Sequence, residues 1–169
     1  MQRICVIGPC GAGKSTLARR LGEALGLPVV HIDQIQWKPG WVEAETDERD
    51  RRIMEAADAP RWVIDGNYSG TLPHRLSRAD TVVVLDLPAW RCRWRVIKRI
   101  ARHWGRTRPD MVEGCRERLD AEFLAYVWRF HRDERPALLA LVRDLPAGVN
   151  VIRLRTPREV REFLQHANA

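Results

Sequence analysis

One octapeptide near the N-terminus constrains this chain more than any other feature. Gly8-Pro9-Cys10-Gly11-Ala12-Gly13-Lys14-Ser15 matches G-x-x-x-x-G-K-[ST] at every fixed position, after an apolar β-type run and before an amphipathic helical pattern. The glycines let backbone N–H groups converge on phosphate oxygens, and the dipole of the following helix adds to this anion site. A glycine-rich turn without a ligand is the alternative, but it accounts for neither the strand before the motif nor the helix after it.

The residues of this motif predict a site for a nucleoside triphosphate. Lys14 would bring its positive charge to the β- and γ-phosphates as a catalytic residue, and the Ser15 hydroxyl would bind Mg²⁺. The thiol of Cys10 needs no role, because backbone groups do the work of such a loop. The predicted nucleotide-binding residues here are Gly8, Pro9, Cys10, Gly11, Ala12, Gly13, Lys14, Ser15 and Thr16.

Apolar runs and helical patterns alternate along the rest of the chain, which is typical of βαβ units with a parallel sheet. Strands are expected at residues 3–7, 29–32, 62–65, 81–85 and 149–154. The first helix should start at about Ser15 and stop at Gly26, and a capping box at Thr156–Glu159 should open the last one. A single α/β domain over residues 1–169 follows.

Three of the expected strands end in an aspartate: Asp33, Asp65 and Asp86. Ligands of such sheets bind at the carboxyl ends of the strands. Asp65 is predicted to hold hydrated Mg²⁺, since the phosphate loop needs an acidic partner for the ion; a plain turn residue before Gly66 is the alternative. Asp86 could simply anchor the loop that follows it.

With these motifs the chain resembles the P-loop nucleotide and small-metabolite kinases, such as adenylate kinase. The resemblance rests on Val63-Ile64-Asp65-Gly66, Asp86-Leu87-Pro88, the arginine pair Arg95 and Arg99, and Arg155-Thr156-Pro157. It implies a five-stranded sheet in the order 2-3-1-4-5, a helical lid at about residues 103–118, and nucleotide contacts by Arg95, Arg99, Arg106 and Arg155.

A closer resemblance is to a bacterial group of adenylate kinase-like proteins often labelled DNA topology modulation proteins. It covers most of the chain and rests on residues 31–33, 37–41, 65–68 and 105–110. The label implies an influence on DNA, although these motifs contain no DNA-binding signature.

The acceptor half of the site departs from adenylate kinase. Gln34-Ile35-Gln36-Trp37-Lys38 follows the second strand, and Asp65-Gly66-Asn67-Tyr68-Ser69 lacks the family's arginine, so a nucleoside monophosphate acceptor is doubtful. Some metabolite kinases have an aspartate at the place of Asp33 that takes the proton of an acceptor hydroxyl, a catalytic role that competes with capping of a turn. Trp37 and Trp41 could line the acceptor pocket, or they could form a hydrophobic plug that packs their loop against the protein.

A basic stretch from Arg91 to Arg108 contains no acidic residue. One helical face of it is apolar and is expected to be a core face; its residues are Trp90, Trp94, Ile97, Ala101 and Trp104. The arginines on another face suit a kinase lid that neutralises the transferring phosphoryl group, with Arg99 as a catalytic residue. A stripe that binds nucleic acid and a solvated face are the other readings.

The bulk properties agree with an enzyme that handles anions. The net charge is +7 and the pI is near 9.9, and no apolar run is long enough to span a membrane. Residues 1–8 do not form a signal peptide, and the four cysteines lack metal or redox spacing, so a cytoplasmic protein with reduced thiols is expected.

These observations predict an ATP-dependent phosphotransferase that uses Mg²⁺ and a small acceptor, with at most weak contact with nucleic acid and none with a membrane. The alternative is a nucleotide-dependent regulatory or DNA-binding protein with little kinase activity.

Overall fold

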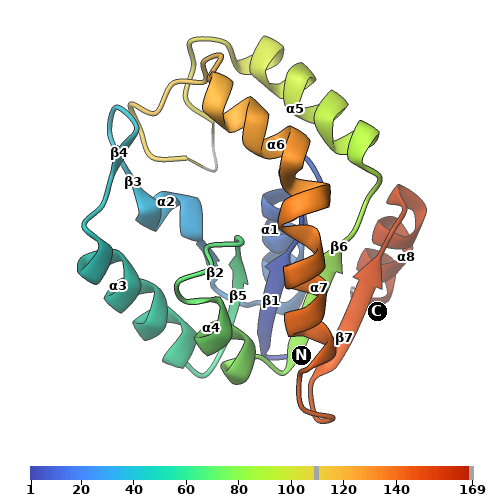
Figure 1. The fold of residues 1–169 in the computed structure, drawn as a ribbon. Coiled ribbons are helices and arrows are strands. Elements are labelled where there is room, and N and C mark those ends of the chain that lie inside the picture. The colour runs from blue at the N-terminus through green and yellow to red at the C-terminus, as the bar shows by residue number, and fades with distance from the viewer. Residues whose placement is uncertain (109–110, 168–169) are drawn as a thin grey trace.

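The protein is described by a computed structural model that covers residues 1–108 and 111–167. At its centre is a five-stranded sheet in which every pair of neighbours is parallel (Figure 1). The strand order is β2 (Val29–His31), β5 (Trp62–Asp65), β1 (Arg3–Ile7), β6 (Thr81–Leu85) and β7 (Asn150–Leu154). The predicted fold class and the order 2-3-1-4-5 are confirmed.

Helices cover both faces of this sheet and make a three-layer sandwich. One face packs on α1 (Lys14–Leu25) and α8 (Pro157–Ala167), with Leu17, Leu21 and Leu164 in its core. The other face packs on α3 (Thr46–Asp58), α4 (Leu72–Arg78), α6 (Ala121–Asp133) and α7 (Arg135–Arg143). Both cores form because β-strand side chains alternate between faces: Ile4 and Val6 of β1 belong to one core, and Cys5 and Ile7 to the other.

Two predicted helix ends are confirmed by their caps. Gly26 follows α1 with φ +61°, and its N–H donates to the carbonyl of Gly22, as expected for a glycine C-cap. At the start of α8, the N–H of Glu159 donates to Oγ1 of Thr156, while the Glu159 carboxylate accepts from the N–H of Arg155 at 2.7 Å.

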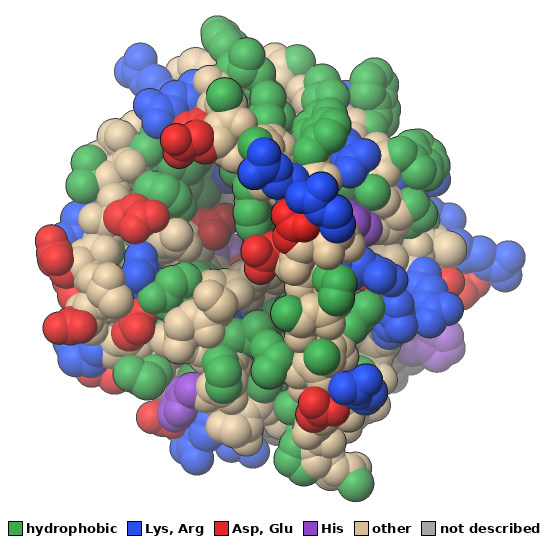
Figure 2. All heavy atoms as spheres, in the orientation of Figure 1, with side chains coloured by type: hydrophobic (Ala, Val, Ile, Leu, Met, Phe, Trp, Pro, Cys, Tyr) green, Lys and Arg blue, Asp and Glu red, His purple; other side chains and the backbone are tan. Residues whose placement is uncertain are grey.

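The predicted core face of α5 (Ala89–His103) is wrong. Trp90, Trp94, Ile97 and Trp104 are 44–61% exposed, whereas Cys92, Val96 and Ile100 are buried. Val96 and Ile100 of α5 pack against Cys10 of the 8–15 loop and against α6, and Cys92 belongs to the core beneath that loop, so a narrow strip of small and branched side chains packs the helix. The wider aromatic face points outward, and hydrophobic side chains are visible over α5 in Figure 2.

A short excursion between β2 and α3 was not predicted. It consists of α2 (Ile32–Gln36) and an antiparallel pair, β3 (Trp37–Lys38) and β4 (Val42–Glu43). The predicted lid at about 103–118 corresponds to the connection between α5 and α6, of which residues 109 and 110 lie outside the described residues.

The four cysteines are all free thiols, as expected. Within the described ranges, no helix combines the length and the apolar character that crossing a membrane requires.

Candidate active site

The 8–15 loop joins the central strand β1 to α1, and its glycines are required by close neighbours. Gly8, Gly11 and Gly13 have φ values of 141°, 80° and 100°. A Cβ on Gly8 would lie 2.3 Å from the carbonyl oxygen of Leu85, and one on Gly11 would lie 2.3 Å from that of Cys92. The loop is therefore wedged between β6 and α5, where only glycine fits.

The start of α1 offers the polar groups that a phosphate needs. Gly13 is the N-cap and has no side chain to satisfy the first N–H groups of the helix, so these remain available for an anion. Lys14 reaches back over the loop, and its Nζ donates to the carbonyl of Pro9 at 3.3 Å. Ser15 is half-buried at the mouth of the loop, and Thr16 is exposed beside it.

Two side chains from elsewhere in the chain support the loop. Oδ1 of Asn67 accepts from the N–H of Gly8 at 3.0 Å, and its Nδ2 donates to the carbonyl of Gly8 at 2.7 Å. Nη1 of Arg95 donates to the carbonyl of Ala12 at 3.1 Å. Arg95 therefore lies at the phosphate loop, where the resemblance places it, but it contacts the loop backbone.

A buried arginine fixes the backbone on either side of Asn67. Arg75 of α4 has no exposed surface, and it donates to the carbonyls of Gly66 at 2.8 Å and Tyr68 at 2.7 Å. Burial lowers the pKa of this guanidinium, and the nearby Cys5 and Asp65 oppose that effect. These two hydrogen bonds from Arg75 therefore fix the backbone of the loop that follows β5.

Asp65 lies at the end of β5 and is 4% exposed. Its Oδ1 contacts Nδ1 of His31, which ends the neighbouring strand β2. Within the described residues, no group of three or more His, Cys, Asp or Glu side chains could hold a metal ion by itself. A hydroxyl at Ser15 and a single carboxylate at Asp65 suit Mg²⁺, which binds oxygen ligands and retains several waters.

Asp33 lies in the first turn of α2 with its side chain exposed, directly after β2. It is close enough to Tyr126 of α6 to influence that phenol. Burial is the main cause that raises the pKa of Tyr126, the charges of Cys10, Glu134 and Asp33 add to it, and a hydrogen bond with Asn67 opposes it. Asp33, Tyr126 and the supported phosphate loop therefore share one edge of the sheet.

Arg99 lies two turns beyond Arg91 on α5 and is engaged by an acidic residue. Its Nη2 is 3.2 Å from Oε1 of Glu117, whose other oxygen is 2.8 Å from Nε of Arg108. Arg106 is exposed in the same connection, and its carbonyl accepts a hydrogen bond from the N–H of Glu117 at 2.9 Å.

The connection between α5 and α6 also contacts the segment that contains β3 and β4. Nε1 of Trp41 donates to the carbonyl of Arg116 at 2.8 Å, and Sγ of Cys115 lies 3.3 Å from the carbonyl of Lys38. The expected lid and the β3–β4 pair are therefore joined in this structure.

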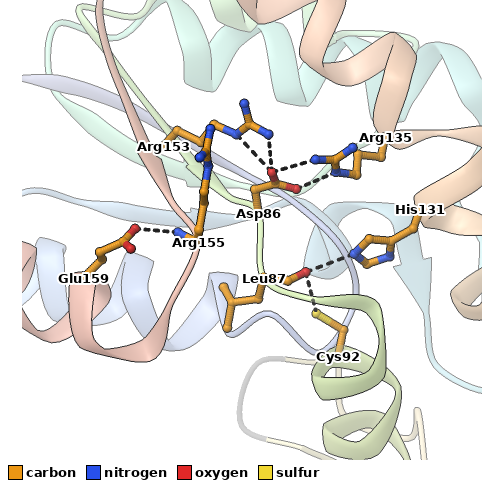
Figure 3. Close-up of polar contacts among 8 residues, drawn as sticks. All are labelled: Asp86, Leu87, Cys92, His131, Arg135, Arg153, Arg155 and Glu159. Carbon is orange, nitrogen blue, oxygen red and sulfur yellow. Dashed lines mark hydrogen bonds and ion pairs between the residues drawn. The ribbon is translucent and has the colours of Figure 1, made fainter.

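Asp86, which follows β6, is bonded to one arginine of α7 and one of β7 (Figure 3). Its carboxylate accepts two hydrogen bonds from Arg135 at 2.7 and 3.0 Å and two from Arg153 at 2.9 and 2.5 Å. Beside it, Nε2 of His131 lies 3.0 Å from the carbonyl oxygen of Leu87. This network joins α6, α7 and β7 to the end of β6. Arg155 follows β7 and is exposed.

Burial would raise the pKa of the Asp86 carboxyl. The hydrogen bonds and charges of Arg135 and Arg153 outweigh that effect and hold the pKa below its usual range.

Sequence reasoning missed three residues that this geometry singles out: Asn67, Glu117 and Tyr126. Asn67 had a local signal, because it directly follows the Asp-Gly step at the end of a strand. Glu117 and Tyr126 had no such local signal, because each is singled out by its interaction with a residue that is distant in the sequence.

Comparison with known proteins agrees with this geometry. The family model described as an AAA domain (AAA_18) matches residues 4–113, which is more than half of the chain. The chain belongs to this family. Together with the relatives below, this places it in the P-loop kinase superfamily.

Curated relatives match less than half of the chain. The adenylate kinase of Thermotoga petrophila is 35% identical over 80 residues, which cover 47% of this chain and 36% of that protein. The shikimate kinase of Corynebacterium diphtheriae is 45% identical over 58 residues, which cover 31% of this chain and 34% of that protein. The match thus spans about a third of the length of these relatives.

Solved structures extend the likeness in fold to nearly the whole chain. Shikimate kinase from Acinetobacter baumannii superimposes with a TM-score of 0.59 at 20% identity, over 98% of this chain and 90% of that one. Shikimate kinase from Bacteroides thetaiotaomicron gives a TM-score of 0.58 at 16% identity, over 98% and 95%.

Proposed function

We propose that this protein is an ATP-dependent phosphotransferase that phosphorylates a hydroxyl group on a small acceptor. The observation that carries the proposal is the shared carboxyl edge of the parallel sheet, where the Lys14 loop follows β1 and Asp33 directly follows β2. A triphosphate donor needs the Lys14 loop, and a hydroxyl acceptor benefits from a base such as Asp33.

The transfer step uses the residues as follows. Backbone N–H groups of the loop and Lys14 bind the β- and γ-phosphates, and Arg99 neutralises charge on the transferring group. The acceptor oxygen attacks the γ-phosphorus and gives its proton to Asp33. A new O–P bond forms as the bond between the γ-phosphorus and the β–γ bridging oxygen breaks, and ADP leaves.

Mg²⁺ would be held by the Ser15 hydroxyl and, through water, by Asp65. When bound, the ion neutralises charge on the phosphates. His31 orients the Asp65 carboxylate from the neighbouring strand, which keeps that side chain at the edge of the sheet.

The test measures ADP release in the presence of small hydroxyl compounds. We expect Lys14→Ala to abolish transfer with the fold intact, while Lys98→Ala, which removes an exposed lysine over the Trp94 ring, keeps the wild-type rate. Asp33→Asn should retain ATP binding but lower transfer about a hundredfold, the usual scale for a general base, whereas Asp144→Asn, at an exposed helix end, is its matched control. Wild-type turnover by Lys14→Ala would refute the proposal.

A second candidate function, a nucleotide-dependent DNA-binding regulator, has one observation in its favour. The outward face of α5 combines exposed Trp90, Trp94 and Trp104 with cations, among them Arg91 stacked 4.8 Å from the Trp90 ring centre. Aromatic side chains with neighbouring cations can bind nucleic acid without sequence preference.

A further inference from the structure

A row of apolar and mostly aromatic side chains runs along the outside of α5. It consists of Trp90, Trp94, Ile97 and Ala101 at helical spacing, followed by Trp104 directly after the helix. All five are exposed, and the row from first to last is about 21 Å long at the rise of an α-helix. Figure 1 places α5 at the outside of the molecule, and Figure 2 shows hydrophobic side chains gathered over it. We call this row the α5 aromatic face; contiguous exposed apolar surface of this kind marks a site of interaction.

Cations accompany the α5 aromatic face along its length. Arg91, Lys98 and Arg102 each follow a member of the row by one residue and therefore lie along its flank. The Arg91 guanidinium is 4.8 Å from the centre of the Trp90 ring, and Nζ of Lys98 is 5.1 Å from that of the Trp94 ring. Within the described part of the chain, none of these three cations forms an ion pair with a carboxylate. Their charge is thus available to an anionic partner.

The exposed aromatic surface continues onto α6 through Arg93. Nη2 of Arg93 donates to the carbonyl of Trp128 at 2.7 Å, and its guanidinium lies 5.4 Å from the centre of the Trp128 ring. The Trp128 side chain is itself exposed. Since residues 91–108 contain no carboxylate, a partner that fits this surface offers apolar contact and negative charge together.

Shape and charge distinguish the partners that could meet these requirements. A single strand of nucleic acid binds along a positively charged groove and stacks its bases on open rings. The α5 aromatic face is the convex side of a helix, and a cation of the chain already lies over one side of the Trp90 and Trp94 rings. A second copy docked by a twofold axis would set the same cations against each other.

An anionic lipid surface fits both the shape and the charge. Tryptophan prefers the boundary between hydrocarbon and water, and lysine and arginine keep their charged ends among the headgroups while their stems cover apolar surface. A helix with this pattern lies in the plane of the interface. The prediction of no contact with a membrane rested on the length of apolar runs, which matters for a helix that spans the bilayer and not for one that lies on it.

We infer that the α5 aromatic face binds an anionic membrane surface, with Trp90, Trp94 and Trp104 among the lipid headgroups and the flanking cations on lipid phosphates. This inference goes beyond the proposed phosphotransferase function and does not depend on it. Arg95 and Arg99 contact the 8–15 loop and Glu117 instead, so the membrane-bound protein keeps them at the site.

The first experiment measures co-sedimentation with vesicles of phosphatidylcholine, prepared with or without phosphatidylglycerol, at two salt concentrations. We expect binding only to the vesicles that contain the anionic lipid, and this binding should weaken as salt rises. Brominated acyl chains in these vesicles should quench the tryptophan fluorescence, because the indoles enter the interface. Absence of binding to the anionic vesicles overturns the inference, and so does binding without quenching, which is adsorption by charge alone.

Variants then test whether this face is responsible. Trp90→Ser/Trp94→Ser should lower the affinity for anionic vesicles about tenfold or more, and Lys98→Ala about fivefold, the scale expected for one cation near a lipid surface. Leu141→Ser, exposed on α7, and Arg19→Ala, exposed on α1, are the matched controls and should bind like the wild type. Far-UV circular dichroism checks that each variant is folded. Unchanged binding by the variants of the face, or equal losses in the controls, contradicts the inference.

Two further measurements separate the other occupants of the face. A single-stranded oligonucleotide should not release the protein from anionic vesicles at the higher salt, and the mass in solution should be the same for the wild type and Trp90→Ser/Trp94→Ser. Release by the oligonucleotide would assign the face to nucleic acid. A dimer that the double variant converts to a monomer would assign it to a second copy of the chain, and either result overturns the assignment to a lipid surface.

Discussion

Arg99 and Glu117 form an ion pair in which the carboxylate is almost fully enclosed. Nη2 of Arg99 is 3.2 Å from Oε1 of Glu117, and the glutamate side chain is only 5% exposed. The guanidinium also lies 5.4 Å from the ring centre of Phe123. A residue expected to contact phosphate is therefore held by a carboxylate, and a phosphate would compete with Glu117 for it.

This competition predicts the effect of Glu117→Gln. The amide keeps the shape of the side chain but removes its charge, so we expect ATP to bind about threefold to tenfold more tightly, a gain of roughly 1 kcal/mol. The measurement is titration with a fluorescent ATP analogue. In an Arg99→Ala background the gain should vanish, because the competing pair is already absent. A gain of equal size in that background would show that Glu117 acts through another residue.

The hydrogen bonds from Asn67 to Gly8 lead to a second prediction. Asn67→Ala removes both bonds to the loop backbone and leaves a partly buried N–H and carbonyl without partners. We expect ATP affinity to fall about tenfold or more, because the loop loses its preorganised shape. Asn150→Ala, at the opposite end of the sheet on β7, is the matched control and should bind ATP like the wild type. If both variants bind equally well, the support from Asn67 is not needed.

Local signals explain what could be predicted from the sequence. The strands and the 8–15 loop have short-range patterns, because buried parallel strands are continuous apolar runs and a phosphate loop needs glycine at fixed positions. The helix caps at Gly26 and Thr156 were predicted for the same reason. Although Asn67 itself has a local signal, the contacts of Asn67 with Gly8 and of Glu117 with Arg99 could not be predicted, because each joins residues that are distant in the sequence and that only the fold brings together.

The prediction of which face of α5 is buried was wrong for a different physical reason. Its sequence carries two apolar stripes, one with Trp90 and Trp94 and one with Cys92 and Val96. Periodicity locates both but does not say which one packs. The shape of the side chains decides which stripe is buried, because the smaller ones fit closely against the 8–15 loop and α6.

Asp86 leads to a prediction about pH. Its pKa is lower in the folded protein than the unfolded value of about 3.9. Its stabilising effect is therefore complete well above that pH and is lost as pH falls through the folded pKa. We expect Asp86→Asn to lower the free energy of unfolding at neutral pH by about 1–3 kcal/mol, since its two arginine partners remain partly solvated.

The measurement is thermal unfolding of the wild type and Asp86→Asn from neutral pH down to about pH 3. The difference between them should be largest at neutral pH and should shrink as the medium becomes acidic. Asp144→Asn, whose carboxylate is exposed, should follow the wild type throughout. A difference that stays constant with pH would contradict the assignment of the charged pair to Asp86.

The arginines of α5 distinguish the kinase from the DNA-binding regulator. Arg95 contacts the loop and Arg99 contacts Glu117, whereas Arg91 lies on the outward face over Trp90. Arg93 contacts α6, because its Nη2 donates to the carbonyl of Trp128 at 2.7 Å. The row therefore has an inward and an outward side, and substitutions on the two sides should have different effects.

We expect Arg99→Ala to lower ATP-dependent transfer about tenfold or more, because it removes a cation from the transferring group, while Arg91→Ala leaves the rate unchanged. Binding of a DNA duplex should be weak, independent of its sequence and lost as salt rises, since contacts with phosphates release counterions. Arg91→Ala should weaken that binding and reduce its dependence on salt. Transfer rate and DNA affinity are measured for each variant at two salt concentrations. Tight, sequence-selective DNA binding at the higher salt, with ATP turnover indifferent to Arg99, would favour the regulator, because a lid arginine that contacts phosphate cannot be removed without cost to the transfer.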